Sequence, residues 1–198
     1  MKKFLLGTML ALSAISAQAQ LKPFVSFDYA DEETRKTNTS SGGAKNYAAN
    51  MTVGFKAPNK WEYSIKAGYT DPVDSSKNNA QNVELKIKKS FDTGLGVLPY
   101  VAVRLGQKFN VTTANIKHYA VDLGLKVPLG AGFAVDVGTR YRNAFHQDDV
   151  PAFNSVRYHA TLLYDINENH GVGLRYAQSH GADAESKNSV RAHYTYNF

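Results

Sequence analysis

Apolar and polar residues alternate with a period of two along most of this chain, from Phe24 to Phe198. Successive side chains of a β-strand point to opposite faces, so each alternating segment predicts a strand with one apolar and one polar face. The predicted strands are Phe24–Ala30, Asn46–Lys56, Trp61–Thr70, Asn82–Ser90, Val97–Gly106, His118–Val127, Phe133–Arg142, Ser155–Asp165, Gly171–Ala177 and Asn188–Phe198. The pattern therefore predicts an all-β fold with ten strands, and counts of eight or twelve stay open.

The lengths of these strands and of their connections indicate a barrel that crosses a membrane. Most segments have nine to eleven residues, the length that a tilted strand needs to cross a bilayer. Short connections, such as APNK at 57–60 and PLGAG at 128–132, alternate with long polar ones, such as 31–45 and 71–81. Short turns at one end and long loops at the other are typical of antiparallel up-and-down barrels of the bacterial outer membrane.

The charged residues avoid the apolar face. Leu123 falls on the apolar face of its segment and Asp122 on the polar face, and only Lys89, near a predicted strand end, falls clearly in the apolar phase. A charge at mid-bilayer on a lipid-facing surface costs about 2–4 kcal/mol, so lipid contact would enforce this exclusion. Aromatic residues such as Trp61 and Tyr69 flank the apolar stretch. The pattern favours a transmembrane barrel over a soluble one, whose apolar side chains would point inward.

Residues 1–19 predict a secretory signal peptide. Lys2 and Lys3 precede an apolar run, and Ala17–Ala19 offers a small-residue cleavage pattern, so we expect cleavage after Ala19 and a single barrel domain over residues 20–198. Such a signal implies export toward the cell outer membrane. The chain has no cysteine, so disulfides cannot stabilise it. Without Lys2 and Lys3 the formal charge is +4, which is too small and dispersed to indicate nucleic-acid binding.

These features together resemble the small outer-membrane β-barrel proteins of Gram-negative bacteria, whether porin-like or OmpA-like. The resemblance rests on the signal peptide, the ten alternating segments and the final HYTYNF at residues 193–198. In such proteins the barrel-assembly machinery reads a last strand that has alternate aromatic residues and ends on phenylalanine. The resemblance therefore implies that Tyr194, Tyr196 and Phe198 carry the assembly signal, and that outer-membrane lipid and lipopolysaccharide are partners.

The polar face predicts a lumen with more bases than acids. Its arginines are the candidate anion-binding residues, namely Arg104, Arg140, Arg142, Arg157, Arg175 and Arg191. All but the first lie on the last four strands, so they would line one continuous wall. Guanidinium groups along a pore can pass a carboxylate or phosphate from one bidentate contact to the next. The pattern is also faintly similar to the oligogalacturonate-specific porins. We therefore predict a porin-like protein that passes or binds small anionic solutes.

A closed barrel is the main alternative, because ten strands enclose only a narrow lumen. Asp122, Asp136 and Asp165 could pair with the arginines and fill the space. Such a barrel would act as a structural or surface-interaction protein whose loops contact lipopolysaccharide or other cells.

An enzyme is the less favoured alternative. His146, Asp148 and Asp149 could activate water at the outer rim, but the second aspartate pair that omptin-like proteases need is not evident. The sequence predicts no catalytic residue, no metal site and no cofactor.

Overall fold

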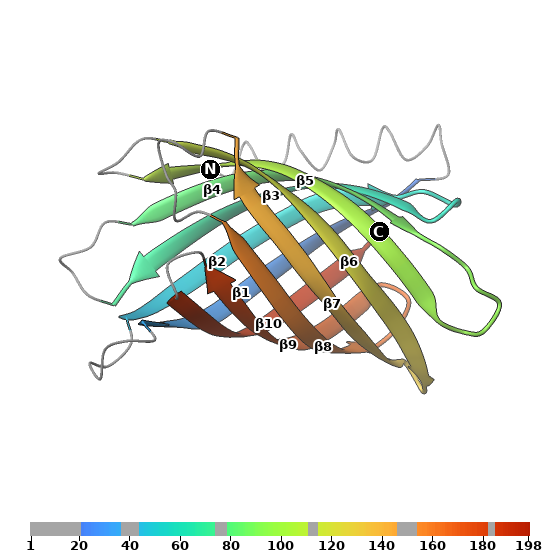
Figure 1. Cartoon of the computed structure of the whole chain (residues 1–198). Helices are drawn as coiled ribbons and strands as arrows, with labels where there is room; N and C mark the ends of the chain where they lie inside the picture. Colours follow the sequence, from blue (N-terminus) through green and yellow to red (C-terminus); the bar gives the residue numbers. More distant parts are fainter. Residues whose placement is uncertain (1–20, 37–43, 74–78, 111–114, 146–153, 182–184) are drawn as a thin grey trace.

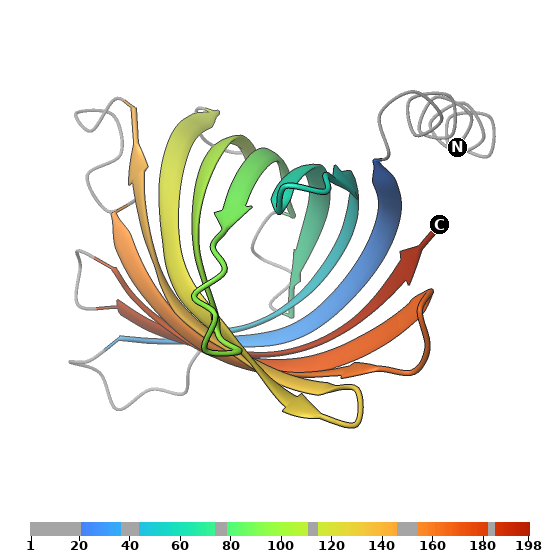
Figure 2. The same cartoon turned by 90° about the vertical axis from the view of Figure 1, so that its right-hand side faces the viewer.

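The computed structural model of the protein describes residues 21–36, 44–73, 79–110, 115–145, 154–181 and 185–198. Their ten antiparallel strands form a closed barrel in which sequence neighbours pair and β1 pairs with β10 (Figures 1 and 2). The strands are β1 (Lys22–Lys36), β2 (Ala44–Lys56), β3 (Trp61–Pro72), β4 (Ala80–Ser90), β5 (Leu98–Asn110), β6 (Ile116–Gly130), β7 (Phe133–Ala144), β8 (Ser155–Asp165), β9 (His170–Gly181) and β10 (Glu185–Asn197). The predicted ten-stranded up-and-down barrel is confirmed.

Two sequence predictions fall on residues outside this description, the signal peptide at 1–19 and the candidate hydrolytic group at His146, Asp148 and Asp149. Among the described residues, no helix is long and apolar enough to cross a membrane.

Several strands extend further toward the loop end than the sequence predicts. β1 continues to Lys36 instead of ending at Ala30, and β10 begins at Glu185 instead of Asn188. Backbone pairing persists there, since Glu32 lies opposite Ser189. Beyond the apolar band the strands no longer contact hydrocarbon, so polar residues occur on both faces. The sequence there loses its alternation of apolar and polar residues and resembles a loop. Part of the predicted long loop at 31–45 is therefore strand, and that boundary was wrong.

The short turns lie at the opposite end of the barrel and follow the predicted sequence signals. In the turn between β6 and β7, Gly130, Ala131 and Gly132 all have positive φ, at 89°, 50° and 82°. Glycine adopts this left-handed backbone without steric cost, which explains the two glycines around the reversal. The start of β1 and the end of β10 share this end, because Phe24 lies opposite Asn197.

The ladder keeps the two faces of the sheet separate around the whole barrel. Asp122 lies opposite Ala102 and Arg140, all on the lumen face, whereas Leu123 lies on the outer face. Leu123 is 54% exposed and Asp122 is buried. Lys89, the basic residue in the apolar phase, lies at a strand end, where its Nζ donates a hydrogen bond to the Asn59 carbonyl oxygen at 2.6 Å. Apolar residues outside and charges inside reverse the arrangement of a soluble barrel.

Aromatic side chains cluster toward both ends of the outer face. Toward the short turns, the rings of Phe133 and Tyr164 stack with centroids 4.5 Å apart. Toward the loops, the rings of Tyr119 and Phe145 lie 5.4 Å apart. Two such bands flanking an apolar zone match the aromatic girdles of membrane barrels.

We expect Leu123→Arg to lower the free energy of unfolding by about 2–4 kcal/mol, because the substitution places a charge on the middle of the hydrocarbon-facing surface. Urea titration of the protein folded in lipid vesicles measures this loss. Leu95→Arg is the matched control, since Leu95 is 83% exposed in the turn between β4 and β5, and it should change stability little. Equal losses from both variants would show that the outer face of β6 does not contact hydrocarbon.

Candidate functional site in the lumen

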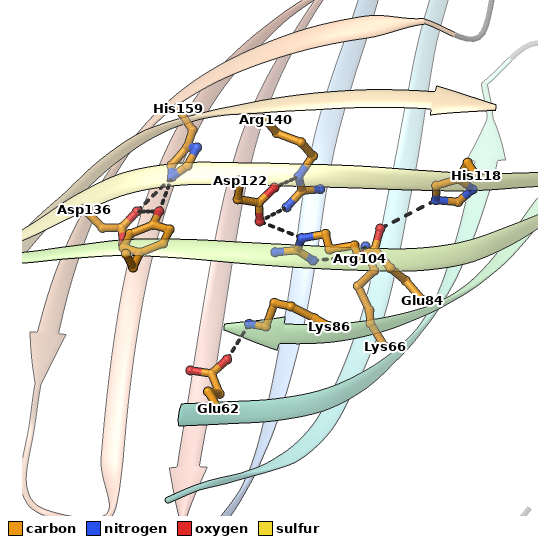
Figure 3. A network of polar contacts seen from close by, with 11 residues as sticks. Glu62, Lys66, Glu84, Lys86, Arg104, His118, Asp122, Asp136, Arg140 and His159 are labelled. Carbon is orange, nitrogen blue, oxygen red and sulfur yellow. Dashed lines mark hydrogen bonds and ion pairs between the residues drawn. The ribbon is translucent and has the colours of Figure 1, made fainter. Parts of the chain in front are cut away.

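Ion pairs link five consecutive strands on one side of the lumen, as their side chains in Figure 3 show. Asp122 accepts hydrogen bonds from the Nε atoms of Arg104 and Arg140, both at 2.6 Å. The Nη1 of Arg104 donates to Glu84 Oε1 at 2.5 Å, and the Nζ of Lys66 lies 3.2 Å from the same oxygen. These five residues, from β3 to β7, are called the ion-pair network below.

The register of the strands explains why these side chains meet. Lys66 lies directly opposite Glu84, and Asp122 lies directly opposite Arg140. Arg104 lies opposite Ala120, which is fully buried, and this small residue leaves the guanidinium room to lie against the barrel wall. Each of the two acids thereby contacts two bases, as the pairing of buried charges requires.

A second polar cluster consists of Tyr100, Asp136 and His159, from β5, β7 and β8. The Tyr100 hydroxyl donates to Asp136 Oδ1 at 3.0 Å. The Nε2 of His159 lies 2.8 Å from the same oxygen, and Figure 3 shows His159 beside Asp136. Glycine on the neighbouring strand makes room for both rings. A Cβ at Gly124 would overlap the Tyr100 ring, and a Cβ at Gly138 would lie 2.8 Å from the His159 ring.

A third cluster joins β1 to β10 where the barrel closes. The Nη2 of Arg191 lies 3.4 Å from Glu32 Oε1, and its Nη1 lies 3.8 Å from Asp28. Lys187 also forms an ion pair with Glu32. Sequence reasoning missed Glu32 and Lys187 because they lie beyond the predicted strand ends. Extending the period of two from Asp28 through Ala30 would have placed Glu32 on the lumen face.

Arg157 and Arg175, on β8 and β9, differ from the arginines of these clusters and are called the arginine pair below. The Nε of Arg157 donates to Ser179 Oγ at 2.8 Å. The Nε of Arg175 donates to Thr161 Oγ1, also at 2.8 Å. Among the described residues, no carboxylate forms an ion pair with either guanidinium, and no further acceptor binds their Nη groups. Neutral hydroxyls thus orient both arginines without neutralising them. The carboxylates that attract them act without forming an ion pair, Glu32 on Arg157 and Asp136 and Asp28 on Arg175.

Neighbouring arginines increase the positive charge around this pair. Arg157 lies directly opposite Arg140, and Arg175 lies directly opposite Arg191. Like charges in directly opposed positions repel each other, and Arg157 is repelled electrostatically by both Arg140 and Arg191. Asp122 forms an ion pair with Arg140, and Glu32 forms ion pairs with Arg191 and Lys187. Glu32 also attracts Arg157, but the arginine pair itself forms no ion pair among the described residues.

The arginine pair lines a lumen cavity of about 570 Å³. From Arg157 and Arg175 the lining extends to Lys56 and Asn197 near the short turns. Cavities of roughly 300–1,000 Å³ commonly hold small molecules. The lumen therefore combines a space of ligand size with two guanidinium groups that form no ion pair among the described residues.

The six predicted arginines all lie on the lumen face but do not form a uniform wall. Arg104, Arg140 and Arg191 form ion pairs, whereas Arg157 and Arg175 bind hydroxyls. Arg142 shares the face, opposite Ala120 and Ser155. Anion binding by these residues stays a prediction.

The residues of the predicted assembly signal gather on the outer face near the turn between β8 and β9. The Nδ1 of His170 lies 2.6 Å from the Tyr194 hydroxyl. The His170 and Tyr196 rings pack with centroids 5.1 Å apart, and the Tyr196 and Phe198 rings with centroids 4.9 Å apart. Recognition of this aromatic group by an assembly machinery stays a prediction.

Comparison with known proteins supports the fold. An outer-membrane channel from Pseudomonas putida F1 is similar with a TM-score of 0.59 and 7% identity, covering 89% of this chain and 95% of the channel. The NanC porin is similar with a TM-score of 0.52 and 11% identity, covering 86% of this chain and 98% of the porin. The fold is that of an outer-membrane β-barrel. Identities this low show the fold alone, because one fold hosts many functions.

Sequence comparison adds one relative. An uncharacterised protein of Haemophilus influenzae is 26% identical over 188 residues, which cover 89% of this chain and 99% of that protein. No family model matches the chain. A function for this barrel must therefore be argued from the lumen.

We expect Asp122→Asn to lower the free energy of unfolding by about 3 kcal/mol, because breaking a buried ion pair leaves its partners uncompensated. Here Arg104 and Arg140 would both lose their shared carboxylate. Unfolding by urea in vesicles, followed by the fluorescence of Trp61, measures the change.

Asp92→Asn is the matched control, since it removes a carboxylate from an exposed ion pair in a turn. Asp92 accepts a hydrogen bond from Lys60 Nζ at 2.6 Å, and this bond lowers the pKa of Asp92. Because water screens the exposed pair, stability should stay close to that of the wild type. An unchanged stability of Asp122→Asn would contradict a structural role for the ion-pair network.

Proposed function

We propose that this protein is a porin-like barrel of the outer membrane whose lumen binds small anionic solutes and lets them pass. One observation carries the proposal: among the described residues, the arginine pair has hydroxyl partners and no carboxylate partner, and it lines the lumen cavity. The fold, shared with outer-membrane channels and porins, is compatible with this role.

The chemistry of the guanidinium group explains the preference for anions. Hydrogen bonding of Nε to Ser179 or Thr161 fixes the plane of each side chain. The Nη groups then remain for a carboxylate or phosphate, which arginine binds with short, charge-assisted hydrogen bonds. A hydroxyl partner adds no negative charge, so an anion entering the cavity meets two guanidinium groups that are not held in an ion pair by any described carboxylate.

A closed structural or surface-interaction barrel whose loops contact lipopolysaccharide or other cells is the second candidate. The ion-pair network favours it, because this network occupies the lumen side of five consecutive strands. A barrel of ten strands has little space beyond such side chains. The two candidates differ in whether ions cross the purified barrel.

In planar bilayers the wild-type protein should carry a current that is selective for chloride over potassium. Arg157→Gln and Arg175→Gln should each lower the anion-to-cation permeability ratio several-fold, because each removes from the lumen one positive charge that is not held in an ion pair. The reversal potential under a KCl gradient measures this ratio.

Arg35→Gln is the matched control, since Arg35 is exposed near the loop end of β1 and forms its ion pair with Glu33. It removes the same charge outside the lumen and should leave the ratio unchanged. A wild-type barrel without current would overturn the passage of solutes and favour the closed barrel. A cation-selective current would contradict the role of the arginine pair.

A further inference from the structure

A second group of positive charges lines the same cavity nearer the short turns. It consists of Lys56 on β2, Lys88 on β4 and Lys126 on β6, called the lysine collar below. The three ammonium groups lie close enough for Lys126 and Lys88 to repel Lys56 electrostatically. The cavity therefore has basic groups at two levels.

The lysine collar, like the arginine pair, is not neutralised by ion pairs. Lys56 donates a hydrogen bond to Asn197 Oδ1 at 2.8 Å, and Lys88 lies 4.4 Å from the centroid of the Tyr100 ring. Neither contact supplies a formal negative charge. Within the described ranges, no carboxylate forms an ion pair with any of the three lysines. Glu62, which also lines the cavity, forms its ion pair with Lys86. It lies directly opposite Lys56 and Lys88 and attracts both, so one carboxylate is shared among three lysines.

An acid lies between these two basic levels. Lys126, Asp136, Thr161 and Arg175 occupy one register row across β6, β7, β8 and β9. The outer two are three strand spacings apart, or roughly 14 Å along the sheet. Asp136 lines the cavity and accepts hydrogen bonds from Tyr100 and His159. Along this row, basic residues stand at the two ends and a carboxylate and a hydroxyl stand between them.

We propose that the lumen cavity binds an elongated solute with two anionic ends and an uncharged, hydrogen-bonding middle. One end binds the arginine pair and the other binds the lysine collar. The middle faces Asp136, which repels negative charge and accepts hydrogen bonds, so hydroxyl or amide groups fit there. Hydroxylated dicarboxylates have this chemistry. The inference rests on the proposed anion binding and specifies which anions bind best.

When two anionic groups belong to one molecule and the first has bound one basic group of the cavity, the second binds the other basic group as an intramolecular step. Its effective concentration for a short linker is in the millimolar range, so affinity rises well above that of either contact alone. A solute with one carboxylate gains no such advantage. The preference for two charges over one therefore distinguishes a two-level site from a simple anion-attracting lumen.

The experiment compares glucarate with gluconate, which share a hydroxylated six-carbon chain and carry two carboxylates and one. Isothermal titration of the purified, full-length barrel in detergent micelles measures both affinities without requiring conduction. We expect glucarate to bind at least about tenfold more tightly than gluconate. Lys126→Gln should reduce this ratio several-fold, and Arg175→Gln should weaken the binding of both solutes.

Lys45→Gln is the control, because Lys45 is exposed on the outer face of β2, where it lies opposite Glu33 on β1. It should preserve both affinities. Equal binding of glucarate and gluconate, or an unchanged ratio in Lys126→Gln, would overturn the two-level site while leaving anion binding intact. Failure of the wild type to bind either solute would instead overturn the proposed function. Resistance of the unheated variants to unfolding in SDS verifies that each barrel has assembled.

Discussion

The exclusion of charge from hydrocarbon is the constraint on which the rest of this structure depends. A strand that faces lipid on one side can place ionised side chains only on its other side. Ten such strands, closed through the pairing of β1 with β10, gather most of the strand charges inside one narrow lumen. Charges on the outer face, such as Glu33, Arg35 and Lys45, lie near strand ends. Water and lipid do not solvate these groups as bulk solvent would. The charged side chains inside must therefore pair with one another, and these pairs determine which charges remain available to a solute.

The charged side chains of the lumen are paired differently on its two sides. On β3 to β7, acids and bases alternate from strand to strand, so Glu84 and Asp122 each contact two bases. On β8 and β9, hydroxyls stand where acids would be needed, and Arg157 and Arg175 keep their charge. The first arrangement stabilises the wall, whereas the second leaves it electrostatically strained. This difference between the two sides of the lumen places the candidate site at β8 and β9.

The face of each residue could be predicted from the sequence, but its partner could not. The period of two assigns Asp122 to the lumen and Leu123 to the outside, and the register agrees. That Asp122 binds both Arg104 and Arg140 depends on the relative shift of three strands, which no single segment specifies. Glu32 and Lys187 were not predicted as lumen residues, because the alternation of apolar and polar residues stops at the edge of the hydrocarbon. The backbone pairing of the strands continues beyond that edge. The sequence thus predicted which residues form the wall of the barrel. Only the structure shows which of its arginines form ion pairs and which bind hydroxyls.

A purely structural lumen gives no reason for the two arginines that lack an ion-pair partner among the described residues. Arg157 faces Arg140 directly, and Arg175 faces Arg191 directly, which costs stability through repulsion. A carboxylate in place of the Ser179 or Thr161 hydroxyl would neutralise the nearby guanidinium at the position that already binds its Nε. A lumen that needed only to be filled would gain stability from that exchange. Hydroxyls at both positions instead hold the guanidinium groups in place without adding negative charge, and we therefore propose that an anion from outside the chain supplies it.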